Sequence, residues 1–234
     1  LDEQNLRDET LVVFTSDNGP AITSLHPYGS SGPLRSKKGF LYEGGIRVPG
    51  IVRWPGKVQA GSESDQPVCG VDLLPTLCGL TGAEIPQDRV IDGTDLRPLF
   101  SGESIRRNKP LYWQFHYANS GPQVAMREGD WKLVGYTDGP RFRGTADLTE
   151  EAMEHINSAH LKSFELYNLK NDIGETTDLA AKEPARVNEM SKRMNEMLLE
   201  IQKENPTWPV WTSPRYESKR IIWETDARKQ SKAN

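Results

Sequence analysis

Cysteine is scarce in this sequence, which has 234 residues and only two cysteines, Cys69 and Cys78. Two are too few for the disulfide framework that holds small secreted domains together. The pair could form one bond across a short loop. Cys78, however, lies in an apolar helical pattern, where a free thiol acts as a small hydrophobic side chain. We therefore expect two reduced, buried cysteines, and the cellular compartment does not follow from them.

Long hydrophobic runs and an excess of one charge are also missing. No apolar segment approaches the roughly 20 residues that a membrane-spanning helix needs. The 29 Lys and Arg residues stand against 33 Asp and Glu, for a net charge of -4. They are mixed along the chain, without the basic patch typical of nucleic-acid binding. We therefore predict a globular protein with no membrane span and no nucleic-acid partner, large enough for one or two domains.

The chain begins at Leu1 rather than at a methionine, and residues 1–6 resemble the end of a helix already under way. Within ten residues the sequence enters an apolar, strand-like run. We therefore expect the chain to start inside a larger protein, so the lack of a signal peptide says nothing about the compartment.

The first half of the chain has the pattern of an α/β sheet domain. Residues 11–15 form a short β-branched run, which predicts a strand buried on both faces of a parallel sheet. Residues 19–39 are rich in Gly, Ser and Pro and predict a long loop, and such loops are usually functional. Residues 46–54 predict a second strand. Residues 72–80 predict a helix with Asp72 as N-cap, with leucines on one face and Gly82 at its end.

The second half predicts a small antiparallel sheet covered by one long helix. Its strand-like segments are residues 111–117, 123–127, 131–135 and 164–169. Residues 128–130 form a hairpin signal with glycine in the turn. From 184 to 203, apolar residues recur every three or four positions, and the methionines among them indicate core packing. We place the domain boundary near residue 105, giving domains 1–105 and 106–234.

Asp17 and Asn18 directly follow the first predicted strand. Ligands of open α/β sheets gather at the carboxyl ends of strands. The pair offers one charged and one neutral oxygen, as hard cations such as calcium prefer, and Gly19 would let the backbone turn sharply. The alternative is structural, because Asp-Asn-Gly-Pro is also a strong turn sequence.

Residues 37–50 place two lysines, Glu43 and Arg47 around a glycine-rich turn. A lysine ammonium is a compact positive charge that suits a tetrahedral oxyanion. Arg47 could bind such an anion or pair with Glu43. Taken singly, each of these charges is also compatible with an ordinary surface or pairing residue.

Together, these segments resemble the sulfatase family. The resemblance rests on the order and spacing of Thr-Ser-Asp-Asn-Gly, a Gly/Ser-rich loop, Lys-Gly-x-x-x-Glu-Gly-Gly-Ile-Arg-Val-Pro-Gly and Ile-Val-Arg-Trp-Pro-Gly within residues 15–56. Weaker matches continue to about residue 204. The resemblance implies the edge of an alkaline-phosphatase-like α/β sheet domain, followed by the small antiparallel sheet with its long helix.

The resemblance also implies a reaction: hydrolysis of an aryl sulfate or sulfated carbohydrate to an alcohol and inorganic sulfate. Asp17 and Asn18 would be calcium ligands. Lys38, which directly precedes the glycine, would contact the sulfate and stabilise charge on the leaving group. Arg47 matches a motif position but would be mainly structural. A periplasmic or secreted location is expected from the family alone.

The family's nucleophile, a formylglycine, is expected upstream of this chain, together with further ligands. Ser31 does begin a Ser-x-Pro-x-Arg string, but it follows the calcium pair instead of preceding it and lacks the downstream Thr-Gly. We therefore reject it as the nucleophile and expect the fragment alone to be inactive. His116 and His160 are candidate substrate contacts, with a structural or exposed histidine as the alternative for each.

Two other functions stay open. The first is a phosphate or phosphonate ester hydrolase of the same superfamily, which would use another metal set. The second is a non-catalytic binding module that has kept the fold. The expected partners are a small-molecule or glycan sulfate ester and the remainder of the sulfatase chain.

Overall fold

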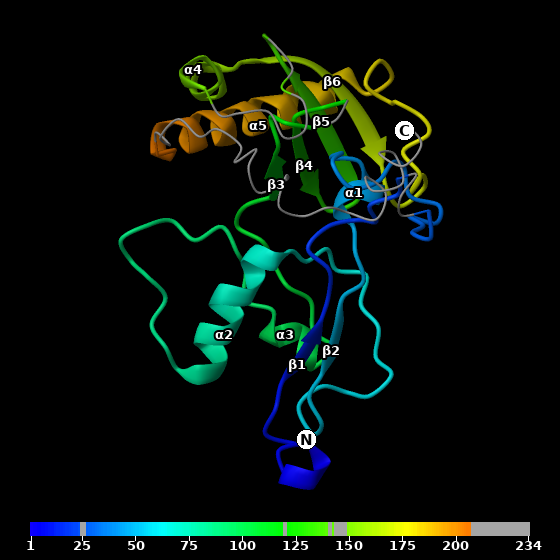
Figure 1. Ribbon diagram of the computed structural model, residues 1–234, viewed down its shortest axis with the longest axis vertical. Coiled ribbons are helices and arrows are strands. Elements are labelled where there is room, and N and C mark those ends of the chain that lie inside the picture. Colours follow the sequence, from blue (N-terminus) through cyan, green and yellow to red (C-terminus); the bar gives the residue numbers. More distant parts are fainter. Residues whose placement is uncertain (24–26, 119–120, 140–141, 143–148, 207–234) are drawn as a thin grey trace, which may run out of the picture.

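The structure is a computed structural model that describes residues 1–23, 27–118, 121–139, 142 and 149–206. Its described elements, in chain order, are η1 (Asp2–Gln4), β1 (Val12–Phe14), α1 (Glu43–Ile46), β2 (Ile51–Arg53), η2 (Gly70–Asp72), α2 (Leu73–Thr81), α3 (Arg97–Phe100), β3 (Leu111–Gln114), β4 (Val124–Glu128), β5 (Trp131–Thr137), α4 (Glu150–Ser158), β6 (Leu161–Asn168) and α5 (Pro184–Glu204). Figure 1 shows them in two parts, with β1, β2, α2 and α3 below and the larger sheet with α1, α4 and α5 above.

The larger sheet is an antiparallel meander in the order β3-β4-β5-β6. The β4–β5 hairpin turns at Gly129, whose φ of 56° is a left-handed conformation that glycine adopts without cost. One face of the sheet packs against α5, where Met190 and Met194 contact Met126 and Leu133 of the strands in one buried cluster. The predicted small antiparallel sheet with one long packing helix is therefore confirmed, and its methionines are core residues.

The other face of this sheet is covered by residues from the first half of the chain. Leu41 and Tyr42 pack with Ala125, Val134 and Tyr167 in a second buried cluster. Accordingly, α1 lies beside the upper sheet in Figure 1, far from β1 and β2 in the lower part. The domain boundary near residue 105 stays a prediction, and the contacts of α1 cross it.

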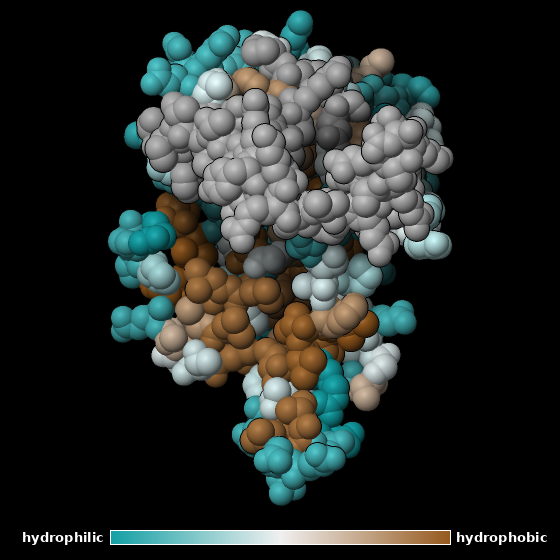
Figure 2. Space-filling view, in the orientation of Figure 1, coloured by the Kyte–Doolittle hydropathy of each residue, from teal (hydrophilic) through white to brown (hydrophobic). Residues whose placement is uncertain are grey.

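The strand predicted within residues 11–15 is present as β1, but its surroundings differ from the prediction. It pairs antiparallel with β2, in the register Val13 with Val52. Every residue of β1 is exposed in this chain, with 61% of Phe14 accessible, so burial on both faces is wrong here. Figure 2 shows the resulting apolar surface as a brown area over the lower part. The second strand is also shorter than the predicted 46–54, because residue 46 ends α1.

Helix α2 begins and ends as predicted, and Gly82 closes it with a φ of 74°. The predicted side-chain cap is wrong. The Asp72 carboxylate accepts a bond from the Cys69 amide at 2.7 Å and pairs with Arg107. On the expected leucine face, Leu73 and Leu77 are exposed in this chain and Leu80 is half-buried. The buried residues of the helix are Pro75, Thr76 and Cys78. Both cysteines are free, but only Cys78 is buried.

Helix α4 is capped by Thr149, whose side chain accepts a bond from the Ala152 amide. The last 28 residues lie outside the described part. Within the described residues, no helix has both the length and the apolar character to cross a membrane.

Candidate functional site

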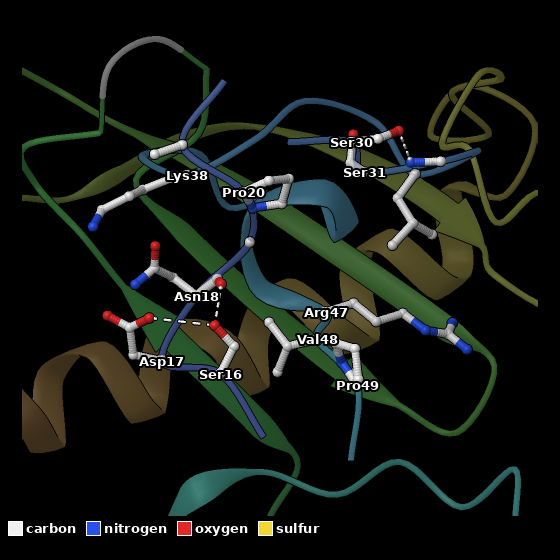
Figure 3. A pocket seen from close by; sticks show the side chains of 14 residues that line it. Ser16, Asp17, Asn18, Pro20, Ser30, Ser31, Lys38, Arg47, Val48 and Pro49 are labelled. Atoms are coloured by element: carbon white, nitrogen blue, oxygen red, sulfur yellow. Dashed lines mark hydrogen bonds between the residues drawn. The ribbon is translucent and has the colours of Figure 1, made fainter. Parts of the chain in front are cut away.

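Asp17 and Asn18 lie where β1 leads into the following loop. The Ser16 hydroxyl donates to the Asn18 carbonyl at 3.0 Å and approaches the Asp17 carboxylate at 3.4 Å, which orders the turn. Asp17 is exposed and Asn18 half-buried. In Figure 3 their side chains and that of Lys38 point to the same side of the site. The structure thus brings the three predicted site residues together.

Three glycines bring this loop against α1. The Gly19 amide donates to the Gly45 carbonyl at 2.9 Å, and a Cβ at Gly19 would lie 1.9 Å from the Gly44 carbonyl oxygen. A Cβ at Gly45 would lie 2.0 Å from the Phe40 carbonyl oxygen. No side chain fits at such distances, so the backbones can touch only where the residue is glycine. The close packing of these backbones therefore requires glycine at Gly44 and Gly45.

Lys38 is held by its backbone, whose amide donates to the Pro20 carbonyl at 3.1 Å. Its side chain is exposed, and the structure shows no bond from its ammonium to another described residue. Lys37 differs, because its ammonium donates to the Ile22 carbonyl. Of the two adjacent lysines, Lys38 is the one whose charge is available to a ligand.

Asp17, Asn18, Gly19 and Lys38 line one open hollow with a volume of about 860 Å³. Asp17, Asn18 and Lys38 occupy one side of it. Arg47 also lines it but points the other way in Figure 3, and its guanidinium lies 3.7 Å from Glu43. Of the two roles open for Arg47, the structure shows the pairing with Glu43.

The oxygen donors of the hollow fit part of a calcium site. Calcium takes six to eight oxygens, from carboxylates and carbonyl groups alike. Asp17 and Asn18 offer a carboxylate and an amide oxygen on one side of the hollow. Within the described ranges, no three acidic, histidine or cysteine side chains gather closely enough to hold a metal. The described residues therefore fit a partial ligand set.

Beneath the site, Glu43 is a buried carboxylate with partners on the upper sheet that the sequence did not reveal. Its side chain pairs with Lys132 of β5 at 2.9 Å, and Lys132 pairs with Glu175 at 2.9 Å. Arg127 of β4 lies 3.7 Å from the Glu43 carboxylate. Burial raises the pKa of Glu175, while the charge of Lys132 acts in the opposite direction. In the sequence, Glu43 is marked only as an acidic residue inside a glycine-rich motif.

A second polar cluster ties residue 35 to the upper sheet. The Arg35 guanidinium lies over the Tyr42 ring, 3.7 Å from its centroid, and donates to the Tyr167 hydroxyl at 2.8 Å. Glu165 accepts bonds from the hydroxyls of Tyr42, Tyr136 and Tyr167. Burial alone would raise the pKa of Glu165, but the three hydroxyls and Arg35 outweigh it and lower that pKa.

Ser31 lines the far side of the hollow from Lys38 in Figure 3. Its hydroxyl donates to the Ser36 carbonyl at 2.9 Å. This bond gives Ser31 a role in closing the loop that carries Arg35. Its exclusion as a nucleophile stays a prediction.

The two candidate histidines do not line the hollow. His116 follows β3, with its Nε2 atom 2.6 Å from the Gln114 amide nitrogen. Burial, with a smaller contribution from His155, lowers the pKa of His116 to about 4. His160 is exposed and its ring lies 3.5 Å from the Asp138 carboxylate. Substrate contact by either histidine stays a prediction.

Comparison with known proteins agrees with the motifs around the hollow. The family model described as Sulfatase matches residues 1–83. Steryl-sulfatase of Mus musculus is 38% identical over 205 residues, which are 81% of this chain and 32% of that protein. Arylsulfatase A of Homo sapiens is 37% identical over 183 residues, covering 76% of this chain and 35% of that protein. This chain therefore spans about a third of the length of these two relatives.

Solved structures agree as well. The crystal structure of Ps i-CgsB in complex with k-i-k-neocarrahexaose has a TM-score of 0.67 and 27% identity, covering 97% of this chain and 43% of that one. The PsFucS1 sulfatase from Pseudoalteromonas sp. has a TM-score of 0.65 and 25% identity, covering 89% and 40%. The fold is the α/β fold of alkaline-phosphatase-like proteins, and the chain belongs to the sulfatase family.

Proposed function

We propose that this chain is part of an enzyme that hydrolyses sulfate esters to an alcohol and inorganic sulfate. The observation that carries the proposal is the position of the Lys38 ammonium, which no other described residue binds, on the same side of one hollow as the oxygens of Asp17 and Asn18. A tetrahedral oxyanion needs positive charge that is fixed in place before the reaction begins. The family match supports sulfate as that oxyanion.

Each residue has a proposed task. Asp17 and Asn18 hold a calcium ion, which when bound supplies positive charge to the sulfate oxygens. Lys38 binds a sulfate oxygen and stabilises the negative charge that develops on the leaving oxygen. The formylglycine nucleophile and further metal ligands are supplied by residues outside this chain, so no turnover is expected from these 234 residues alone.

The remainder of the sulfatase chain is the proposed partner for the apolar surface over β1, β2 and α2. Phe14, Ile51 and Leu77 of these elements are exposed, and Figure 2 shows a largely brown surface over the lower part. Such surfaces usually mark an interface rather than solvent-facing protein. The short matches to relatives, about a third of their length, support a covering segment of the same family.

The relatives indicate the substrate class only broadly. They include proteins named steryl-sulfatase and arylsulfatase A, and one similar structure holds k-i-k-neocarrahexaose. We therefore propose an aryl or carbohydrate sulfate ester. Assaying an aryl sulfate against the matching aryl phosphate separates this proposal from a phosphate ester hydrolase. Faster release of phosphate, with zinc as the bound metal, would support the other reaction.

Replacing Lys38 tests the proposal directly. In the intact protein, Lys38→Ala should lower kcat for an aryl sulfate by about a hundredfold or more, because a preorganised charge is lost. Lys37→Ala is the matched control, since the Lys37 ammonium is bonded to a backbone carbonyl instead. Unchanged turnover in Lys38→Ala, or an equal loss in both variants, would contradict the assignment.

A further inference from the structure

Helix α1 is the point where the two halves of the site meet. On one side, the Gly45 carbonyl accepts a bond from the Gly19 amide at 2.9 Å, one residue after Asn18. On the other side, the position of a Cβ at Gly45 is 2.8 Å from the Lys37 carbonyl oxygen, one residue before Lys38. Both contacts are backbone against backbone. A shift of α1 therefore moves the calcium pair and Lys38 relative to each other.

The orientation of α1 is fixed by charges from the second half of the chain. The Glu43 amide, at the start of α1, donates to the Glu175 carboxylate at 2.6 Å. The Glu43 side chain meets the Lys132 ammonium at 2.9 Å, and the same ammonium lies 2.9 Å from Glu175. Only 2% of Glu43, 0% of Lys132 and 1% of Glu175 are exposed. The trio therefore attaches α1 to β5 and to the loop after β6.

Burying three charges is a costly way to fix a four-residue helix. An apolar cluster of similar volume often stabilises a fold as well or better than a buried ion pair. Ion pairs with hydrogen bonds define direction, however, because their atoms must meet at set distances and angles. Helix α1 has no side-chain cap. Of the charges that reach it from the second half of the chain, Lys132 and Glu175 make contacts below 3 Å, whereas Arg127 lies 3.7 Å from Glu43.

We propose that Lys132 and Glu175 are positioning residues of the sulfatase site, which set α1 and so the separation of Asp17 and Asn18 from Lys38. The inference rests on the sulfate ester hydrolysis proposed above. It assigns part of the chemistry to residues that contact neither substrate nor metal. The Lys38 charge works only at one position relative to the sulfate, so a shift near 1 Å lowers the rate by as much as a hundredfold.

The test uses a charge-balanced variant of the intact protein. Lys132→Met combined with Glu175→Gln removes one charge of each sign and leaves Glu43 beside Arg127. The control is Arg107→Met, which breaks the pair of Arg107 with the buried Asp72 under α2 and does not touch α1. Steady-state kinetics with an aryl sulfate and inhibition by inorganic sulfate are measured well below each melting temperature.

Positioning predicts that the double variant loses kcat by about ten- to a hundredfold and binds inorganic sulfate more weakly, although it is folded. Arg107→Met should melt earlier but keep kcat within about twofold of the starting protein. A folded double variant with unchanged kcat and sulfate inhibition would overturn the inference. Should the double variant not fold, Glu175→Gln alone is measured in the same way, and unchanged kcat there has the same meaning. If Lys38→Ala left kcat unchanged, that result would instead overturn the proposed function.

Discussion

Three glycines set how closely the backbones of this site approach one another. Gly19, Gly44 and Gly45 are buried at one crossing of backbones, where a Cβ would meet a carbonyl oxygen at 1.9 to 2.4 Å. Distances below about 3 Å force the backbone to move, and the touching atoms here are themselves backbone. The motif around Lys38 is therefore a packing requirement as well as a chemical one.

Gly45→Ala should destabilise the intact protein by about 3 kcal/mol, because overpacking at a backbone contact cannot be relieved by a rotamer change. Gly50→Ala is the matched control, since nothing lies within 4 Å of a Cβ placed there. Its effect should stay within about 0.5 kcal/mol. Urea unfolding monitored by circular dichroism measures both. Similar stability of the two variants would argue against the crossing described here.

His116 should make stability depend on pH. Its pKa is lowered to about 4 in the folded chain, mainly by burial, from an ordinary value of 6.5. The folded state then binds fewer protons than the unfolded state between these values, so stability falls as the pH drops from 6.5 to about 4. His116→Gln should flatten this slope in urea unfolding at several pH values, and the exposed His160→Gln is the control. If stability depended on pH to the same degree in His116→Gln, the lowered pKa of His116 would be contradicted.

At the scale of elements, periodicity predicted well wherever one face of an element is buried within this chain. Helix α5 and the β4–β5 hairpin are where apolar spacing and turn glycine placed them. Periodicity did not predict the element correctly where contacts with other parts of the chain determine its structure. Residues 43–46 form a helix instead of leading into a strand, because Glu43 is fixed by charges on β4 and β5.

Helix α5 provides a direct test of its buried stripe. Met194→Ala should cost about 2–5 kcal/mol, because the side chain is fully buried against the sheet and its removal leaves a cavity. Leu199→Ala on the same helix is 51% exposed and should change stability by less than about 0.5 kcal/mol. Thermal and urea unfolding compare the two. Equal costs would show that the helix packs on another face.

At the scale of the whole molecule, the upper part has its own core on both faces of the sheet, whereas the lower part leaves apolar strands exposed. The sequence of β1 has the composition of a strand buried on two sides. The two observations agree if residues outside this chain cover β1 and β2, as proposed for the remainder of the sulfatase.

Phe14→Ser tests this covering. In the intact protein it should destabilise by about 3 kcal/mol, the cost of losing a buried aromatic side chain. Tyr28→Ser, at a residue that is 96% exposed, is the control and should have little effect. The folded intact protein should also bind less hydrophobic dye than the isolated chain. A cost below about 0.5 kcal/mol for Phe14→Ser would mean that this surface is exposed in the intact protein too.

The sequence by itself determined the family, the helix and hairpin of the second half, and the candidates Asp17, Asn18 and Lys38, because these depend on local spacing and motif order. Only the tertiary structure showed that the Lys37 ammonium is bonded to the Ile22 carbonyl, and only it joined Glu43 to Lys132, which lies 89 residues away. Spacing along a chain carries no information about which distant charges share one buried space. That choice is made when α1 packs on the sheet, where burial leaves each charge only a few partners within reach.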